Sequence, residues 1–212
     1  MSEVTLHYFG LYAKAEVTRM ILHYTNTPFN DRIYSDDDTW LQYKKSGLFE
    51  FEQLPMLEID GLRLVQSLSI ERYLCQKFGY YPSDPYEIHL TESLQNIWQD
   101  FIQHKVEWTW IKKDLEGWDN WCDNELPRII QSIEARYINN GCNGHFVGNS
   151  TTLGDFCTFR SLYDHFMISP WSEKMMPFLR NHAPKLLEFA ENFLNSSLSL
   201  KNYLANRPER RF

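Results

Sequence analysis

The chain has 212 residues, of which 43% are hydrophobic and 16% aromatic, and its formal net charge is −7 at pH 7. That length and apolar content suffice for one large domain or two small ones with ordinary cores. The acidic balance argues against nucleic-acid binding, because phosphate recognition needs a concentrated basic face. A local basic group near the C-terminus, Arg207, Arg210 and Arg211, is interpreted as a solvated tail.

The sequence shows neither a targeting pattern nor a metal-binding pattern. The sequence has no apolar run of membrane-spanning length, and its N-terminus has acidic Glu3 without an apolar signal core, so we expect a cytoplasmic protein with no membrane partner. The four cysteines show neither CxxC nor zinc spacing, and no histidine pair is four residues apart. We therefore expect reduced thiols and no metal.

The first third of the chain alternates short strands with amphipathic helices. Val4, Leu6 and Tyr8 alternate with their neighbours, as in a strand, and residues 15–26 carry one apolar stripe, as in a helix. A second strand is expected over residues 29–34, which completes a β–α–β unit. Trp40 and Lys44 follow, four residues apart, and would share one face of a helix.

Residues 53–67 are typical of a proline-led hairpin that runs into a helix. The Asp60-Gly61 pair tolerates positive φ at both turn positions and lies between two short apolar runs. Ser67 is predicted to cap a helix that extends to Phe78, and the free amides at such a helix start favour an anion. This segment predicts a site for a peptide-like ligand with a carboxylate. Pro55 opens the third strand, where spacing leaves both cis and trans isomers open.

A turn-rich break over residues 79–85 marks a domain boundary, because strand signals vanish beyond it and apolar residues recur at helical spacing. Thr152 and Asp155 form a predicted capping box within this second part. The predicted fold is therefore α+β, with β–α–β and β–β–α in domain 1–82, followed by an all-α domain, 83–212.

Tyr8 and a group of four tryptophans are candidates for a role in function. Tyr8 lies near the end of the first strand, where ligands approach α/β sheets, although a half-buried structural tyrosine fits the same pattern. Its phenol, with a pKa of about 10 in water, stays protonated at neutral pH and can donate a hydrogen bond to an anion such as a thiolate. The tryptophan group comprises Trp108, Trp110, Trp118 and Trp121. These side chains either line an apolar pocket or belong to the core, and a core position is the default interpretation.

Together these segments resemble the cytosolic glutathione transferases, and are most similar to the sigma class, which includes haematopoietic prostaglandin D synthase and the S-crystallins. The resemblance spans essentially the whole chain. The motifs that carry it are Leu6-His7-Tyr8-Phe9 with Ala15, Glu16 and Arg19; Trp40-Leu41-Gln42-Tyr43-Lys44; Gln53-Leu54-Pro55; Gln66-Ser67; Val147-Gly148-Asn149; and Asn202-Tyr203-Leu204 with Arg207-Pro208. It implies a thioredoxin-like domain, an all-helical domain and a homodimer.

The resemblance also implies residue roles, with glutathione as co-substrate and no cofactor. Tyr8 falls on the catalytic tyrosine, and Lys14 replaces a thiolate-supporting arginine, keeping charge but losing the planar fork. Asp100 best matches an acidic residue that binds glutathione across the dimer interface, with Glu92 and Gln95 as alternatives. The implied glutathione-binding residues are Tyr8, Phe9, Lys14, Trp40, Lys44, Gln53, Leu54, Pro55, Gln66, Ser67 and Asp100.

The activity implied is that of a detoxification enzyme that turns the glutathione thiol into a thiolate and directs it at small apolar electrophiles. Phe9, Tyr12 and the tryptophans are candidates to face the second substrate. One alternative is glutathione-dependent prostaglandin D isomerisation, and another is a non-catalytic crystallin-like protein, against which Tyr8, Gln66 and Ser67 weigh. The sequence does not identify the second substrate, because pocket shape selects it.

Overall fold

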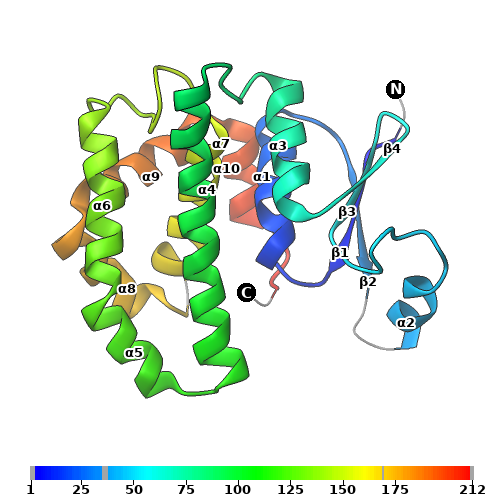
Figure 1. Ribbon diagram of the computed structural model, residues 1–212, viewed down its shortest axis with the longest axis horizontal. Coiled ribbons are helices and arrows are strands. Elements are labelled where there is room, and N and C mark those ends of the chain that lie inside the picture. The colour runs from blue at the N-terminus through cyan, green and yellow to red at the C-terminus, as the bar shows by residue number, and fades with distance from the viewer. Residues whose placement is uncertain (1–2, 35–37, 169, 211–212) are drawn as a thin grey trace. The chain divides into compact units, whose positions relative to one another are not determined.

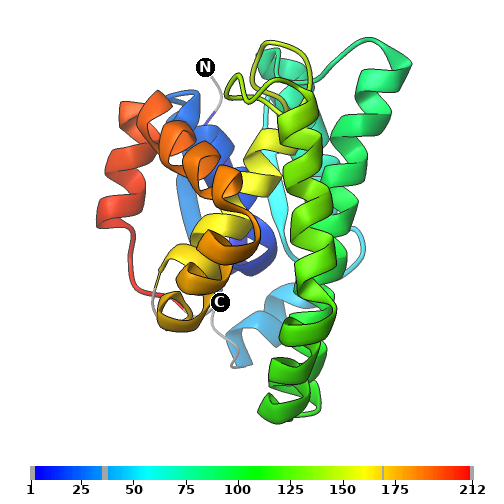
Figure 2. The same cartoon turned by 90° about the vertical axis from the view of Figure 1, so that its left-hand side faces the viewer.

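The computed structural model describes residues 3–34, 38–168 and 170–210. The chain forms two compact units, one made of Met1–Gly79 with Ser197–Phe212 and the other of Tyr80–Ser196. This grouping differs at its C-terminal end from the predicted division into 1–82 and 83–212. The reason is that helix α10 (Leu198–Asn206), drawn in red in Figure 2, packs against α1 (Glu16–Tyr24) of the first unit.

A mixed sheet of strand order β2-β1-β3-β4 forms the centre of the first unit (Figure 1). Its strands are β1 (Thr5–Phe9), β2 (Asn30–Tyr34), β3 (Met56–Ile59) and β4 (Leu62–Val65). Strand β1 is parallel to β2 and antiparallel to β3, and β4 closes a hairpin with β3. The predicted β–α–β then β–β–α order is confirmed.

Helices cover both faces of this sheet. Figure 1 shows α1 and α3 (Ser67–Phe78) on one face and the short α2 (Asp38–Lys44) on the other. Helix α1 follows a single 3₁₀ turn, Ala13–Ala15, and is shorter than the predicted 15–26. It ends early because Asn26 adopts a left-handed φ of 51° that no α-helix continues through.

The hairpin turn confirms the prediction from Asp60-Gly61, whose φ angles are 53° and 78°. The prediction that Ser67 caps α3 is wrong, because Ser67 is already the first helical residue and Gln66 occupies the cap position. The carbonyl of Gln66 accepts hydrogen bonds from the amides of Ser69 and Ile70, at 2.9 and 3.0 Å. The chain therefore turns into the helix one residue earlier than the serine suggested.

Both faces of β1 are buried, so its apolar alternation does not mark a solvent-exposed face. Leu6 is fully buried, as are Met20 and Ile21 of α1 and Ile70 and Leu74 of α3, the two helices on one face of the sheet (Figure 1). On the other side His7 is 1% exposed, and its ring nitrogens lie 2.8 Å from the Tyr34 hydroxyl and 3.2 Å from the Glu58 carboxylate. Burial lowers the pKa of His7 despite the neighbouring Glu58.

The regular elements described in the second unit are all helical, which confirms the predicted helical part of the fold. They are α4 (Pro85–Val106), a π-helical turn (Glu107–Ile111), α5 (Leu115–Asn124), α6 (Leu126–Asn139), α7 (Leu153–Leu162), a second π-helical turn (Tyr163–Met167), α8 (Ser172–His182) and α9 (Pro184–Ser196). Helix α7 is buried along its whole length and packs on α4 and α9. Across the described chain, no helix has both the length and the apolarity to span a bilayer.

The start of α7 confirms the predicted capping box of Thr152 and Asp155. The Asp155 carboxylate accepts hydrogen bonds from the Thr152 amide at 2.6 Å, from the Thr152 hydroxyl at 3.0 Å and from the Phe146 amide at 2.8 Å. Burial raises the pKa of Asp155 to about 7, against the opposing effect of these three donors. The carboxylate therefore ties the 146–152 segment to the first turn of the buried helix.

Candidate active site

Tyr8 lies on β1, one residue before the strand ends, and is 5% exposed. Its hydroxyl oxygen accepts a hydrogen bond from the backbone amide of Lys14, at 3.2 Å. The guanidinium carbon of Arg19 lies 5.8 Å from the centroid of the Tyr8 ring. The phenol is thus held by the loop between β1 and α1.

A small pocket of about 40 Å³ brings many of the predicted binding residues together. Its lining consists of Lys14, Phe51, Gln53, Leu54, Pro55, Val65, Gln66 and Ser67. Sequence reasoning missed Phe51 and Val65 as lining residues. Phe51 is 53% exposed, and an apolar ring two residues before Gln53 was the signal available for it. The pocket therefore joins the β1–α1 loop, the start of β3 and the start of α3.

The backbone around this pocket has two uncommon features. The Leu54–Pro55 peptide is cis, one of the two isomers that the sequence left open. Gln66 has a φ of 67° and a ψ of 111°, and its side-chain amide donates to the Gln53 side-chain carbonyl at 3.3 Å. Strained residues of this kind persist where the surrounding structure fixes them, often at ligand sites. Beyond Gln66, the amides of Ser67 and Leu68 precede the first hydrogen bonds of α3 and can receive an anion.

Trp40 and Lys44 share α2, as predicted, but do not line this pocket. Trp40 packs edge-on against Phe9, Tyr34 and Phe49, with ring centroids 5.5, 5.7 and 5.2 Å away. The aromatic cluster around Trp40 also includes Leu54 and Val65, which line the pocket itself. Trp40 and Phe9 thus lie next to the pocket, and Lys44 follows Trp40 by one helical turn.

Asp100 lies on α4 in the second unit and is exposed. The two alternatives differ from it in their surroundings. Gln95 is 2% exposed, and the Glu92 carboxylate accepts a hydrogen bond from the Tyr81 hydroxyl at 2.6 Å. Of these residues, Asp100 is thus the one whose carboxylate is open to a ligand or a second subunit.

Arg19 is the principal support of the β1–α1 loop. It is 1% exposed, and it donates to the Leu11 carbonyl at 2.9 Å and to the Glu16 carboxylate at 3.0 Å. Its Nε also pairs with Asp31, at 3.0 Å. The sequence matched Arg19 and Glu16 to a family helix but gave no signal for this buried network, which depends on residues distant in the chain.

The interpretation of the C-terminal arginines as a solvated tail is wrong for Arg207 and Arg210; Arg211 lies outside the described residues. Their side chains are 4% and 11% exposed. Arg207 pairs with Glu16 at 2.7 Å, and Arg210 pairs with Asp31 at 2.8 Å. The buried carboxylate of Glu16 and the partly exposed carboxylate of Asp31 hold these guanidinium groups out of solvent, which a local view of the sequence cannot detect.

The four tryptophans do not form one cluster. Trp118 is 4% exposed and stacks on Trp121 with centroids 5.3 Å apart, whereas Trp110 is 51% exposed. The Lys112 ammonium lies 3.8 Å from the Trp108 ring centroid. The core interpretation therefore holds for Trp118.

Tyr12, another residue expected to face the second substrate, is held by the C-terminal segment. Its hydroxyl donates to the Pro208 carbonyl at 2.8 Å, which fixes the Tyr12 ring against that segment.

The described residues contain no group of three or more His, Cys, Asp or Glu side chains arranged to hold a metal ion. The cysteines are free thiols. Cys75, Cys122 and Cys157 are buried and Cys142 is half-buried. Burial raises the pKa of Cys122 to about 12, so that thiol stays protonated at neutral pH.

Comparison with known proteins places this geometry in a family. Residues 4–76 match the model of the glutathione S-transferase N-terminal domain, and residues 99–207 match that of the C-terminal domain. A glutathione S-transferase of Plasmodium falciparum is 30% identical, over 97% of both chains. Haematopoietic prostaglandin D synthase of Gallus gallus is 28% identical over 74% of this chain and 76% of its own.

A solved structure supports the same placement. The sigma-class glutathione transferase of Fasciola hepatica is 25% identical, covers 99% of both chains and superimposes with a TM-score of 0.83. The two family models together cover most of the sequence, on either side of the predicted boundary. The chain therefore belongs to the glutathione S-transferase family.

Proposed function

We propose that this protein is a sigma-like, tyrosine-type glutathione transferase that joins glutathione to small apolar electrophiles in the cytoplasm. The observation that carries the proposal is the composition of the small pocket. Six of its lining residues are ones that the sequence resemblance assigned to glutathione: Lys14, Gln53, Leu54, Pro55, Gln66 and Ser67.

Each end of glutathione has a suitable partner here. The γ-glutamyl carboxylate fits the start of α3, where Ser67 and the first helical amides favour an anion. We propose that the backbone of Leu54 pairs with the cysteinyl amide, as a neighbouring strand would. Lys44 supplies a cation for the glycine carboxylate, and the Trp40 indole N–H a second donor.

Tyr8 is proposed to act on the thiol between these ends. A free cysteine thiol has a pKa of about 8.5, and a hydrogen bond that prefers the anion lowers that pKa. The Tyr8 oxygen accepts from the Lys14 amide at 3.2 Å, which polarises the phenol and strengthens its O–H as a donor. The exposed Lys14 ammonium adds a positive charge on the same side, although without the planar fork of an arginine.

The reaction then requires one nucleophilic displacement. The thiol proton passes to solvent, the sulfur lone pair attacks the electrophilic carbon, and the leaving group departs with the electrons of its former bond. We further propose a homodimer in which Asp100 binds the glutathione amine of the partner subunit, because Asp100 is exposed while Gln95 is buried. No metal or cofactor has a part in this scheme.

The test compares Tyr8→Phe with Tyr73→Phe, a control whose hydroxyl donates to the exposed Asp60. Conjugation of 1-chloro-2,4-dinitrobenzene and calorimetric binding of glutathione are measured for each. We expect Tyr8→Phe to lose at least tenfold in kcat/KM while its affinity for glutathione changes little, since the lost bond acts on the thiolate. Full activity in Tyr8→Phe, with normal glutathione binding, would contradict the assignment.

The same assays on the wild-type protein, with a prostaglandin H2 assay added, separate the alternatives. A crystallin-like protein would bind glutathione and turn over no aryl halide. A prostaglandin D isomerase would convert the endoperoxide prostaglandin H2 with no net consumption of glutathione. Either result in the wild-type protein would replace the transferase proposal.

A further inference from the structure

The loop between β1 and α1 holds Tyr8 through one hydrogen bond and has a strained backbone. Ala13 in this loop has a φ of 28°, a positive value that residues with a side chain rarely adopt. Such a conformation persists only where the surrounding structure fixes it. The hydrogen bond from the Lys14 amide to the Tyr8 oxygen, at 3.2 Å, lies at the long end of the usual range for N–H···O contacts. A small displacement of the loop would therefore break this bond.

The C-terminal segment, residues 207–210, follows α10 and holds the same loop by the side chain of Tyr12. The Tyr12 hydroxyl donates to the Pro208 carbonyl at 2.8 Å, and the Arg207 guanidinium carbon lies 3.9 Å from the centroid of the Tyr12 ring. A guanidinium over the face of an aromatic ring is attracted to it, and more strongly where water is excluded. Tyr12 is only 5% exposed. Its ring and its hydroxyl are therefore both fixed by the C-terminal segment.

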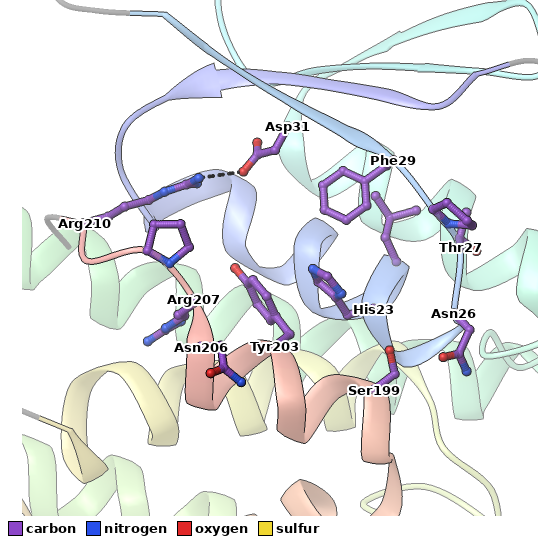
Figure 3. Close-up of a pocket in the computed structure, with 13 residues that line it drawn as sticks. His23, Asn26, Thr27, Phe29, Asp31, Ser199, Tyr203, Asn206, Arg207 and Arg210 are labelled. Atoms are coloured by element: carbon purple, nitrogen blue, oxygen red, sulfur yellow. Dashed lines mark hydrogen bonds and ion pairs between the residues drawn. The ribbon is translucent and has the colours of Figure 1, made fainter.

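The C-terminal segment is itself fixed to the first unit by ion pairs. Figure 3 shows Arg207 and Arg210 on the chain that leaves α10, with Arg210 reaching to Asp31 of β2. Arg207 pairs with Glu16 at 2.7 Å, and Arg210 pairs with Asp31 at 2.8 Å. Arg19 pairs with both of these carboxylates and also bonds the backbone of the β1–α1 loop. The loop and the C-terminal segment are therefore parts of one hydrogen-bonded network.

We propose that the C-terminal segment controls thiolate activation, with Tyr12 and Arg207 as positioning residues for the Tyr8 phenol. This inference rests on the proposed transferase function. With Tyr12 held, the Lys14 amide stays against the phenol oxygen and Tyr8 stabilises the thiolate; with Tyr12 released, the strained loop relaxes and Tyr8 loses this support. Among the described residues, neither Tyr12 nor Arg207 lines the small pocket, so both act through the loop.

The test measures kcat/KM for 1-chloro-2,4-dinitrobenzene against pH in the wild type, Tyr12→Phe and Arg207→Lys. Tyr12→Phe keeps the ring and loses the bond to Pro208, whereas Arg207→Lys keeps a cation for Glu16 and loses the planar group over the Tyr12 ring. We expect each variant to lose about three- to tenfold at pH 6.5, the effect of one weakened hydrogen bond. At pH 9 each should approach the wild-type value, because a free thiol, with a pKa of about 8.5, ionises there unaided.

Arg210→Lys is the matched control, because Arg210 belongs to the same segment but bonds Asp31 instead of Tyr12, and its pH profile should match the wild type. Urea unfolding shows that each variant is folded. The ultraviolet absorbance of the bound thiolate gives the pKa of the glutathione thiol, which should rise in Tyr12→Phe and Arg207→Lys alone. Wild-type profiles in both variants, or an equal loss at every pH, would overturn the inference. Full activity in Tyr8→Phe would contradict the proposed function itself, and this inference with it.

Discussion

Glu16 and Arg207, 191 residues apart in the chain, form a buried ion pair with 2.7 Å between Oε1 and Nη1. Their side chains are 0% and 4% exposed. Glu16 also accepts from Arg19 at 3.0 Å and from the Tyr203 hydroxyl at 2.9 Å. A single carboxylate on α1 therefore holds the C-terminal segment and the arginine that supports the β1–α1 loop.

Loss of this pair should destabilise the protein strongly. Arg207→Ala leaves the Glu16 carboxylate buried with one guanidinium fewer, and we expect the free energy of unfolding to fall by about 3 kcal/mol. Urea denaturation measures the change. Arg128→Ala is the control, since Arg128 is 75% exposed and lies 3.8 Å from Glu125, and it should shift stability by less than about 0.5 kcal/mol. Equal effects in the two variants would show that the buried pair contributes no more than a surface one.

Substitutions of Gln66, which has a positive φ, should affect stability and glutathione binding differently. Gln66→Gly removes a strained side chain, so we expect its free energy of unfolding to stay within about 1 kcal/mol of the wild type. Its affinity for glutathione should fall about tenfold, because the side-chain amide beside Gln53 is lost. Gln66→Ala should lose the same affinity but be less stable than Gln66→Gly. Calorimetry and urea unfolding test both variants, and an undiminished affinity in both would remove Gln66 from the proposed site.

The hairpin turn gives a purely conformational prediction. Gly61 has a φ of 78°, where a side chain is strained, although no described atom lies within 4 Å of an added Cβ. We therefore expect Gly61→Ala to lower the free energy of unfolding by about 1 kcal/mol. Gly10→Ala provides the comparison, because its added Cβ would meet Ile33 Cγ2 at an ordinary 3.6 Å. Thermal or urea unfolding that ranks Gly10→Ala as the more damaging change would contradict the argument.

The buried side chain of Lys105 should make the stability of the protein depend on pH. Its ammonium is buried 2.9 Å from His165 Nδ1, and burial, with the nearby Arg160 charge, lowers its pKa from 10.5 to about 7. Between these two pKa values the unfolded chain binds a proton that the folded protein does not, so this residue makes stability rise with pH, by up to about 1.4 kcal/mol per unit.

The measurement is urea unfolding at pH 7, 8 and 9 for the wild type, Lys105→Met and Lys45→Met. Lys45 is exposed and serves as the control. We expect the rise between pH 7 and 9 to be reduced in Lys105→Met and preserved in Lys45→Met. Because an apolar residue replaces a desolvated amine, Lys105→Met should also be at least as stable as the wild type at pH 7. An identical pH profile in all three proteins would show that Lys105 titrates normally.

Much of the fold was predictable because local patterns determine it. The alternation around Leu6, the stripe on residues 15–26 and the Asp60-Gly61 turn each act over a few residues and were confirmed as β1, α1 and the β3–β4 hairpin. The predicted cap of α3 was wrong. Serine has a higher capping propensity than glutamine, but the backbone conformation of Gln66 decides where the helix begins. Propensity cannot report a φ that the tertiary structure imposes.

In the candidate site too, features set by local sequence were predictable and features set by tertiary contacts were not. Gln53, Pro55, Gln66 and Ser67 are close in sequence, and the structure brings them into one pocket. The supporting network was not predictable, because Arg207 gains its partner from α1 and no local pattern links the two positions. Charged residues near a terminus are usually solvated, and only the tertiary structure shows that these two arginines are not.

The return of the chain to its first unit has a consequence for biosynthesis. Residues 80–196 lie between the main part of that unit and the helix that completes it, α10. During translation the sheet can therefore form early, but Glu16 must wait for Arg207, which leaves the ribosome 191 residues later. A ribosome stalled after residue 196 would carry a thioredoxin-like unit that still lacks the partners of a buried carboxylate, and such a nascent chain should remain sensitive to proteases until Arg207 has emerged.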